Sequence, residues 1–472
     1  TIARLNRGGG GTLFFPAGTY LTGSIHLKSN ITLELEAGAT LLFSDNFDDY
    51  LPFVEVRHEG VMMKSFQPLI YAVDAENITI KGEGTLDGQG KKWWMEFFRV
   101  MIDLKDNGMR DINKYQPMWD AQNDTTAIYA ETNKDYVSTL QRRFFRPPFI
   151  QPVRCKKVKI EGVKIVNSPF WTINPAFCDN VTVHGVTIYN PSKDPKGPNT
   201  DGINPSSCRN VRISDCFISV GDDCITIKSG RDADGRKYGK ACENITITNC
   251  VMLSGHGGVV IGSEMSGGVR RVTISNCVFD GTDSGIRLKS SRGRGGVVEE
   301  LRVDNIVMKN IQRNAFIFDL FYDKESKVEP VSERTPVFRN IHLSNITGSD
   351  IKQIGYIKGI EEMPVQGLSF SNINMKAEVG FIVDIAEDIR FDNVDFSSQT
   401  GSPWQFSKCK QIVLNNVRSK YPVNQQPIVT FEDVDNAIIN NCFQMTPVKD
   451  FYKANNSHII EGHNYWKKES FK

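Results

Sequence analysis

Short runs of alternating apolar and polar residues recur along most of the chain. Many runs begin with a polar residue, often asparagine, and continue apolar, polar, apolar, as in Asn180–Val183, Asn210–Ile213 and Asn244–Ile247. Alternation with a period of two is typical of a short β-strand that turns one face inward. Such runs lie at 77–80, 157–160, 180–183, 210–213, 244–247, 271–274, 301–303, 340–343, 368–370, 389–391, 412–414 and 437–439.

The spacing of these runs indicates a structural repeat. Between Val158 and Val272, the first apolar residues of successive runs lie 23, 30, 34 and 27 residues apart, a spacing typical of solenoids and other repeat folds. No long helical pattern separates the runs, which argues against βαβ folds and leucine-rich repeats. Coils stacked about 4.8 Å apart bury one continuous core. We therefore predict an all-β chain, a single-domain right-handed parallel β-helix over residues 1–472.

Asparagine and cysteine recur with the coils. Asparagine at a turn tolerates left-handed backbone and can hydrogen-bond its equivalent in the next coil. Among the ten cysteines, Cys208, Cys242 and Cys277 are separated by about one coil. We interpret the cysteines as buried thiols that stack like small apolar residues. Disulfides remain an alternative for an exported protein, whereas a metal site is disfavoured because no CxxC pair occurs.

One segment, residues 91–150, lacks the repeated run. Its aromatic and Met residues Trp93, Trp94, Phe97, Phe98 and Met101 follow the spacing i, i+1, i+4, i+5, i+8, which predicts an amphipathic helix. The segment ends in a stretch rich in Arg and Phe at 142–149. We expect a partly helical insertion that shapes one end of a cleft, with capping of exposed core as the alternative.

Charge and hydropathy exclude some classes of function. The 472 residues carry 56 Lys and Arg against 55 Asp and Glu, a net charge of +1. Proteins that coat nucleic acids need a basic surplus, so no nucleic-acid partner is expected. No run approaches the ~18 consecutive apolar residues of a membrane helix, so we expect no membrane-spanning segment. The oligomeric state is left open.

Four polar motifs between residues 199 and 289 depart from the strand pattern. They are Asn199–Gly202 (NTDG), Gly221–Cys224 (GDDC), Gly255–Gly258 (GHGG) and Arg287–Lys289 (RLK), each about one coil after the one before. In a solenoid, residues one period apart lie on neighbouring rungs of the same face. We therefore expect the motifs to converge on one patch.

The residue types in these motifs suit the hydrolysis of a glycosidic bond. Repulsion between the adjacent Asp222 and Asp223 is costly unless they are exposed, and it favours one carboxyl that stays protonated. Glycoside hydrolysis needs one acid to protonate the leaving oxygen and one carboxylate to activate water. Arg287 and Lys289 point to one side of a strand and could hold a sugar carboxylate. Taken singly, the motifs could equally be solvated turns, a calcium ligand and an exposed strand face.

In combination, the motifs resemble those of glycoside hydrolase family 28, the polygalacturonases. The resemblance runs from GGTLFFPAG at 10–18 to the last strand runs and is densest between NSPFW at 167–171 and GRGG at 293–296. The stretch Ile261–Gly268 (IGSEMSGG) is similar to the bacterial and plant-like branch. The family implies a pectin-lyase-like solenoid and hydrolysis of galacturonosyl linkages with inversion, without metal or other cofactor.

The resemblance also implies a role for each motif residue. Asp222 is expected to be the general acid, Asp201 and Asp223 to position and deprotonate the water, and His256 to tune the ionisation of the acid. The expected substrate-binding residues are Arg287 and Lys289, which hold a uronate carboxylate, together with Asn199 and Lys228. No metal ligand is expected. Trp171 and Tyr189 are candidate sugar-stacking residues, with core or turn packing as the alternative.

Two features bear on the substrate. Many family members carry a tyrosine one coil after the R-x-K motif, whereas the matching stretch 314–318 reads NAFIF and Tyr322 lies nearby without being its equivalent. The sugar in the leaving position therefore stays open. Exo-acting relatives often carry bulky additions, so the insertion favours release of terminal galacturonate. The expected partner is a pectic polysaccharide or oligosaccharide, either homogalacturonan or derived from rhamnogalacturonan.

Two other functions use the same solenoid. A calcium-dependent pectate lyase would use the aspartates as calcium ligands, and a non-catalytic β-helix would only bind polysaccharide. Because a plant-wall substrate lies outside cells, we also expect export to the periplasm or the medium. Because the first residues show no charged and apolar signal pattern, we expect the signal peptide for this export to be absent from the chain given.

Overall fold

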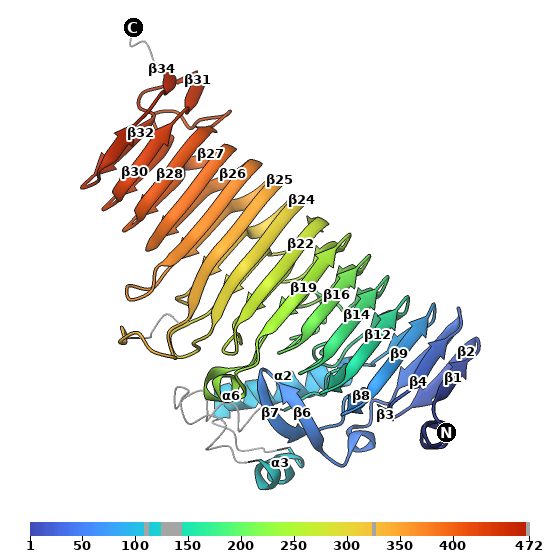
Figure 1. Ribbon diagram of the computed structural model, residues 1–472. Coiled ribbons are helices and arrows are strands. Elements are labelled where there is room, and N and C mark those ends of the chain that lie inside the picture. The colour runs from blue at the N-terminus through green and yellow to red at the C-terminus, as the bar shows by residue number, and fades with distance from the viewer. Residues whose placement is uncertain (108–112, 124–143, 323–326, 469–472) are drawn as a thin grey trace. The chain divides into compact units, whose positions relative to one another are not determined.

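Parallel strands stacked in successive coils dominate the computed structural model, which describes residues 1–107, 113–123, 144–322 and 327–468 (Figure 1). The chain divides into two units. Unit 1 contains Thr1–Cys250, Ser254–His256 and Glu264–Val269, and unit 2 contains Val251–Leu253, Gly257–Ser263 and the chain from Arg270 onward. The largest sheet has 27 strands. The predicted parallel β-helix is confirmed.

Three columns of buried aliphatic side chains run through unit 1, one for each strand position in a coil. In the first column, Leu33, Ile80, Ile160, Val183, Ile213 and Ile247 are aligned in parallel register. The second aligns Leu41, Leu86, Ile165, Ile188 and Ile218, and the third aligns Ile150, Ile173, Ile203 and Ile225. All these side chains are buried, so stacking supplies the core that no single coil could enclose.

The strands of unit 1 are β1 (Gly11–Phe15), β2 (Gly18–Thr22), β3 (Ile25–His26), β4 (Ile31–Leu35), β5 (Ala39–Phe43), β6 (Val54–His58), β7 (Val61–Ser65), β8 (Ile70–Val73), β9 (Glu76–Gly82), β10 (Thr85–Asp87), β11 (Ile150–Val153), β12 (Lys156–Glu161), β13 (Lys164–Val166), β14 (Asp179–His184), β15 (Thr187–Tyr189), β16 (Arg209–Ser214), β17 (Phe217–Ser219), β18 (Ile225–Ile227) and β19 (Cys242–Thr248). Its helices are α1 (Ile2–Arg7), the 3-10 helix η1 (Phe47–Tyr50), α2 (Lys91–Asn107), α3 (Gln116–Gln122) and α6 (Asp232–Tyr238).

The coils of unit 2 are also in parallel register, and the four longest of its described strands run for 20 to 23 residues. Ile286, Phe316, Gly355, Phe381, Trp404 and Val429 form one aligned column. Its strands are β21 (Val259–Gly262), β23 (Ser284–Lys289), β24 (Val297–Asp319), β25 (Val337–Lys358), β26 (Val365–Asp384), β27 (Ala386–Ser407), β28 (Lys410–Arg418), β29 (Val429–Glu432), β30 (Asp435–Asn440), β31 (Phe443–Val448), β32 (Tyr452–Asn455), β33 (Ile459–Glu461) and β34 (Tyr465–Lys468). Two further strands, β20 (Val251–Ser254) and β22 (Val269–Asp280), have residues in both units.

The first residue of many repeated runs adopts left-handed backbone, as expected for asparagine. Asn180, Asn210 and Asn244 each have φ of 58°. The amide nitrogen of Asn244 donates to Oδ1 of Asn210 over 3.0 Å, so equivalent asparagines bond from coil to coil. Lys157 has φ of 55° without being asparagine, which shows that stacking imposes the turn even on a residue that disfavours it.

All ten cysteines are free and buried. Several thiols donate to backbone carbonyls of the coil, for example Sγ of Cys208 to the oxygen of Pro175 over 3.2 Å. The interpretation as stacked apolar thiols is therefore confirmed, and the disulfide alternative is not.

The insertion contains the predicted amphipathic helix, α2. Trp93 and Trp94 are buried, and the Trp94 indole donates to the Ser168 oxygen over 3.0 Å. Phe98 was expected on the packed face but is 40% exposed. Trp93 instead packs with Phe47, 4.2 Å between ring centroids, which draws the helix toward η1. Residues 142 and 143 of the Arg- and Phe-rich stretch lie outside the described residues.

Two further departures from the coil pattern were not predicted. Strands β6 and β7 form an antiparallel hairpin, and α6 interrupts the chain after β18. At the hairpin turn, a Cβ on Gly60 would lie 2.9 Å from Cβ of Glu264. The Gly60 oxygen also accepts from the Arg231 backbone nitrogen over 3.0 Å. The hairpin turn therefore packs closely against the residues that surround the site described below.

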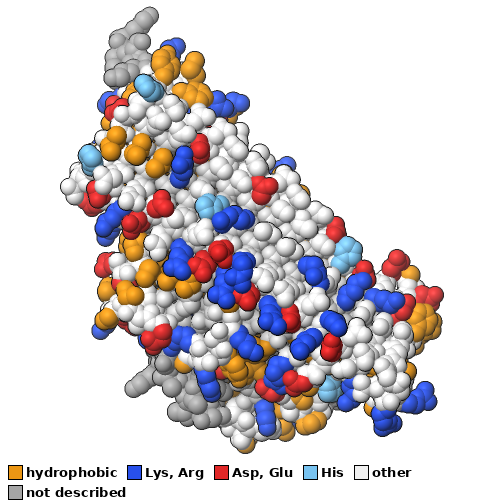
Figure 2. Space-filling view, in the orientation of Figure 1, with side chains coloured by type: hydrophobic (Ala, Val, Ile, Leu, Met, Phe, Trp, Pro, Cys, Tyr) orange, Lys and Arg blue, Asp and Glu red, His pale blue; other side chains and the backbone are white. Residues whose placement is uncertain are grey.

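Acidic and basic side chains are interspersed on the face drawn in Figure 2, in keeping with the near-zero net charge. Among the helices in the described ranges, none is both long enough and apolar enough to cross a bilayer.

Candidate active site

Asp201 ends the loop that leads into the third strand position of its coil. Ile203 pairs in parallel with Ile225 of the next coil, so Asp201 and the GDDC motif lie on neighbouring rungs. Oδ2 of Asp201 accepts from the amide of Asn204 over 2.9 Å and from the hydroxyl of Thr226 at 3.5 Å. Only 3% of Asp201 is exposed, and these donors compensate part of the cost of burying its charge.

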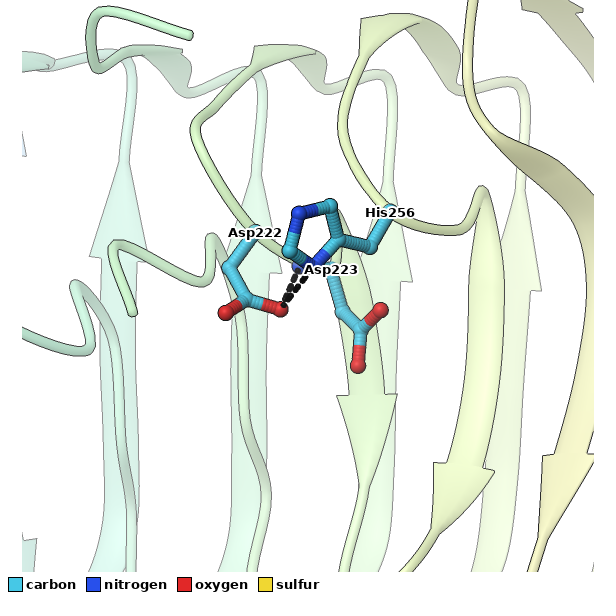
Figure 3. Close-up of side chains that lie close together, drawn as sticks. All are labelled: Asp222, Asp223 and His256. Atoms are coloured by element: carbon cyan, nitrogen blue, oxygen red, sulfur yellow. Dashed lines mark hydrogen bonds and ion pairs between the residues drawn. The ribbon is translucent and has the colours of Figure 1, made fainter. Parts of the chain in front are cut away.

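Asp222 and Asp223 follow Gly221 on the next rung, and His256 from the rung after contacts Asp222 (Figure 3). The backbone nitrogen of His256 donates to the Asp222 oxygen over 2.9 Å. Its Nδ1 lies 3.0 Å from Oδ1 of Asp222. One ligand atom from each of the three side chains lies within 4.8 Å of the others. The aspartates of the NTDG and GDDC motifs and the histidine of the GHGG motif are therefore brought together within unit 1.

The two adjacent aspartates differ in exposure. Asp222 has a side chain that is 16% exposed, whereas Asp223 is 1% exposed. We expected adjacent aspartates to require exposure, and for Asp223 this is wrong. A buried cation, Lys228, lies near enough to interact electrostatically with both Asp201 and Asp223, and this attraction offsets the repulsion that the sequence analysis considered.

Lys228 is buried in an ion pair. Its Nζ lies 2.7 Å from Oε2 of Glu264, with 5% and 11% of the two side chains exposed, and 4.7 Å from the centroid of Trp171. Burial by itself lowers the pKa of Lys228, but the charges of Glu264, Asp201 and Asp223 outweigh burial and raise it above its ordinary value. Lys228 therefore remains a fixed positive charge beside the two buried aspartates.

The thiol of Cys224 lies close enough to all three aspartates for their charges to affect its pKa. Burial raises the pKa of Cys224, and the charges of Asp223, Asp201 and Asp222 raise it further. The thiol of Cys224 therefore stays neutral and donates to the backbone oxygen of Ser254 over 3.2 Å.

His256 has a second partner that the sequence analysis missed. Nζ of Lys196 lies 2.8 Å from Nε2 of His256. An ammonium group can only donate, so Nε2 accepts and the ring proton resides on Nδ1, which donates to Asp222. Lys196 lies in the loop before the NTDG motif, and only its charge could have marked it in the sequence.

A second chain of polar contacts reaches Asp222 from Arg146 through Asn199. Nη2 of Arg146 donates to Oδ1 of Asn199 over 2.7 Å, and Nδ2 of Asn199 lies 3.5 Å from Oδ2 of Asp222. Asn199 was predicted as a substrate-binding residue, whereas Arg146 was not singled out. Its place in the Arg- and Phe-rich end of the insertion was the available signal.

Arg287 and Lys289 belong to unit 2 and lie on β23. Nζ of Lys289 is 5.8 Å and Cζ of Arg287 is 5.9 Å from the ring centroid of Tyr322, which is 41% exposed. Phe316 and Phe318 of the NAFIF stretch are fully buried, so that stretch is core. Tyr322 is therefore an exposed aromatic residue beside both cations.

The two candidate stacking residues behave differently. Trp171 is 3% exposed and packs on Lys228 and on Phe170, so it is part of the core beneath the site. Tyr189 is 52% exposed and remains able to contact a ligand.

A cavity of about 630 Å³ is lined by Lys91, Lys92, Asn167, Pro191 and Pro195, among others. It thus lies between the start of α2 and the loop that carries Lys196.

The family model of the Glycosyl hydrolases family 28 matches residues 138–387. The chain belongs to this family. The resemblance drawn from the NTDG, GDDC, GHGG and RLK motifs is thereby confirmed. The expectation that the chain is a glycoside hydrolase with a β-helical fold is confirmed as well.

Relatives of this family 28 member include both exo- and endo-acting enzymes. It is 27% identical to an exo-poly-alpha-D-galacturonosidase of Dickeya chrysanthemi, covering 85% of this chain and 68% of the relative. It is 28% identical to an endo-polygalacturonase of Pectobacterium carotovorum, covering 76% and 78%. Among solved structures, a hyperthermoactive exopolygalacturonase of Thermotoga maritima matches with 34% identity and a TM-score of 0.71, covering 84% and 86%.

Proposed function

We propose that this family 28 enzyme hydrolyses galacturonosyl linkages in pectin and releases terminal galacturonate. The observation that carries the proposal is the assembly of Asp201, Asp222, Asp223 and His256 on neighbouring rungs of one unit. Family membership and the 34% identity to an exopolygalacturonase support the same activity.

In the proposed reaction, Asp222 is the general acid. It gives its proton to the oxygen of the leaving sugar while the bond from that oxygen to the anomeric carbon breaks. Water attacks the anomeric carbon from the opposite face, and a carboxylate base takes its proton. Asp222 is the most exposed of the three aspartates, which suits the residue that must reach the leaving oxygen.

Separation between carboxylates favours Asp201 as the base. Inverting glycosidases keep their two carboxyl groups about 6.5–9.5 Å apart to admit water. Oxygen atoms of Asp222 and Asp223 lie within 4.8 Å of each other, a shorter gap. Asp201, on the neighbouring rung, is the better candidate to deprotonate the water, and Asp223 the better candidate to position it.

His256 and Lys196 serve the acid in this proposal. The proton on Nδ1 of His256 is directed at Oδ1 of Asp222 because Nε2 accepts from Lys196. A donor in this place stabilises the carboxylate that forms as the proton leaves. His256 therefore favours proton donation in the transition state.

Substrate binding is assigned to cationic, amide and aromatic groups. Arg287 and Lys289 hold a uronate carboxylate, and the exposed ring of Tyr322 stacks on a sugar beside them. Asn199 and Lys228 complete the proposed set, with Lys228 acting on the aspartates through its charge as well. The pectic chain is the proposed partner.

The insertion supports the exo mode. Within unit 1, α2 contacts Ser168 through Trp94 and approaches Arg146 through Phe97, beside the loop that carries Asn199. A bulky segment at this place limits how far a polymer can extend past the acid, so only a chain end fits. Export of the enzyme remains a prediction from the polymeric substrate.

Product analysis tests the proposal. Purified enzyme is incubated with homogalacturonan and with rhamnogalacturonan oligosaccharides, and products are followed in time by chromatography and by NMR of the anomeric proton. Galacturonate as the sole early product, released as the inverted anomer, is expected. Early oligomers of mixed length would refute the exo mode. Unsaturated products whose formation stops with a chelator would identify a lyase. If no products form at all, the protein only binds polysaccharide.

A further inference from the structure

Arg146 lies near the end of the insertion, and its side chain is buried between aromatic rings. Only 2% of the residue is exposed. Its Cζ lies 4.1 Å from the ring centroid of Phe97 and 5.1 Å from that of Phe170. A planar guanidinium packs well against such rings. Because Phe97 belongs to α2, the helix of the insertion fixes the place of Arg146.

The guanidinium also clamps the loop before Asp201. Nη1 donates to the backbone oxygen of Pro169 over 2.9 Å and to that of Pro198. Nη2 donates to Oδ1 of Asn199 over 2.7 Å. Three acceptors from two segments therefore converge on one buried cation.

This clamp determines which way the Asn199 carboxamide points. Arginine has donors and no acceptor, so the Asn199 atom that faces Arg146 must be the oxygen. The amide nitrogen is then turned toward Asp222 and lies 3.5 Å from its Oδ2. This distance is at the long end for a hydrogen bond, so the contact is weak and depends on the carboxamide being held.

We propose that Arg146 is a positioning residue for the general acid, acting through Asn199. By holding the Asn199 oxygen it keeps a donor beside Asp222, and it thereby couples the insertion to proton transfer. A carboxamide turned the other way would present its oxygen to Asp222. That oxygen would accept the acid's proton and compete with the oxygen of the leaving sugar. The inference rests on the proposed function for the role of Asp222.

Other groups beside Asp222 are held by contacts that do not involve Arg146, such as the Asp223 backbone nitrogen, which donates to Oδ1 of Asp222 over 2.9 Å. Asp223 follows it in the chain, His256 donates to it and is held by Lys196, and the Cys224 thiol feels its charge. A shift in the ionisation of the acid in an Arg146 variant is therefore assigned to Asn199.

A double-mutant cycle tests the proposal. Arg146→Leu, Asn199→Ala and the double variant are purified, checked for folding by thermal denaturation, and assayed on a short oligogalacturonate. We expect Arg146→Leu to lower kcat by about 10- to 100-fold with little change in KM. The double variant should lose no more than Asn199→Ala alone, because one effect runs through the other. Losses that multiply would overturn the proposal.

The pH profile distinguishes positioning from packing. A lost donor makes Asp222 ionise at higher pH, so the alkaline limb of kcat/KM should move up by about half a pH unit in both single variants. A lower kcat with an unmoved limb would indicate packing alone and overturn the proposal. Arg154→Leu is the matched control, since Arg154 is an exposed arginine paired with Asp74 and Glu55, and it should retain wild-type kinetics.

Arg146→Lys provides a second variant if Arg146→Leu does not fold. One ammonium cannot span all three acceptors, so the same cycle applies with smaller losses. A wild-type enzyme that is inactive on every galacturonan would refute the proposed function. In that case the orientation of Asn199 is tested in a crystal structure of the Arg146 variant. An Asn199 carboxamide still directed at Asp222 there would overturn this inference, and a rotated one would support it.

Discussion

The coils of unit 1 and those of unit 2 obey the same register but differ in how often they are interrupted. In unit 2, strands β24 to β27 run for 23, 22, 20 and 22 residues. In unit 1, strands β12 to β19 are only 3 to 7 residues long. The loops between the short strands hold Asp201, Asp222 and Lys196. The proposed catalytic residues therefore lie where the repeat is interrupted.

Unit 2 shows the repeat in its regular form. An asparagine ladder joins Asn345, Asn372, Asn393 and Asn416, with hydrogen bonds of 3.2, 2.8 and 3.1 Å. Phe370 stacks on Phe391 with centroids 4.9 Å apart. Such a ladder gives the asparagine at each successive turn a hydrogen-bond partner in the neighbouring coil, so it stabilises the fold. Substitutions in the two units should therefore separate activity from stability.

The largest effect is expected at the acid. Asp222→Asn removes the proton that the leaving oxygen needs, so kcat should fall by about 10²- to 10⁴-fold with KM nearly unchanged. Steady-state kinetics on oligogalacturonate measure this.

Asp392→Asn is the matched control for the acid. Asp392 accepts from Asn415 in the regular part of unit 2 over 2.8 Å, and its variant should keep its activity within about twofold, as expected for a residue outside the site. Equal losses in the two variants would contradict the division between the units.

The buried pair should have the next largest effect. Lys228→Met leaves Glu264 buried without its cation, which should cost about 3–5 kcal/mol of unfolding free energy and lower kcat because Asp201 and Asp223 lose a neighbouring positive charge. Chemical denaturation and kinetics measure both.

A double variant separates the two consequences. Lys228→Met with Glu264→Gln removes both charges, so stability should return while kcat stays low. Recovery of kcat together with stability would reduce Lys228 to a structural role.

The pH dependence of the pair follows from the raised pKa of Lys228. A lysine whose pKa is raised by folding stabilises the protein fully below its unfolded value of about 10.4 and loses that contribution only as pH rises beyond it. Wild-type stability should therefore lose this contribution only in strong alkali.

Substrate recognition should show a moderate effect. Lys289→Ala removes a cation that is proposed to bind a uronate carboxylate, so KM should rise by about tenfold or more and preference for galacturonate over galactose should fall. Competition assays with the two sugars measure this. Lys309→Ala, an exposed lysine of the same unit, is the control, and an unchanged sugar preference in Lys289→Ala would exclude the role.

The smallest effect is expected in the asparagine ladder. Asn393→Ala removes a carboxamide that bonds in both directions and places alanine at φ of 56°, so unfolding should become easier by about 1–3 kcal/mol without loss of kcat. Asn393→Gly relieves the backbone strain but not the lost bonds, so it should lie between wild type and Asn393→Ala in Tm. Equal Tm for Asn393→Gly and wild type would assign the whole effect to the backbone.

The sequence predicted the repeat because its physical basis is local. Alternating residues such as Val181 and Val183 need only the next coil to bury them, so period and polarity sufficed for the fold. The grouping of Asp201, Asp222 and His256 followed from the same period. The sequence analysis did not predict the partners of Arg146, Lys196 and Glu264. These partners depend on how the loops and the β6–β7 hairpin pack against the coils, and the period of the repeat does not determine loop conformation.

Burial was the other limit. The exposure expected for Asp223 was wrong because a charge 5 residues later, Lys228, sits on the same rung with its own partner 36 residues further along. Sequence shows each charge but not which ones meet. Tyr322, set aside on spacing alone, follows β24 in the chain. It lies beside Arg287 and Lys289 because its backbone nitrogen donates over 3.0 Å to the oxygen of Ser290, which directly follows β23.

The ten reduced thiols carry a consequence for the lifetime of the enzyme. While the coils are closed, each sulfur is shielded from oxidants, and folding requires no oxidising machinery. Once the chain unfolds, ten thiols reach solvent together. In air they form non-native disulfides that prevent refolding. The useful life of the protein outside a reducing environment is therefore governed by how rarely it opens, more than by its equilibrium stability.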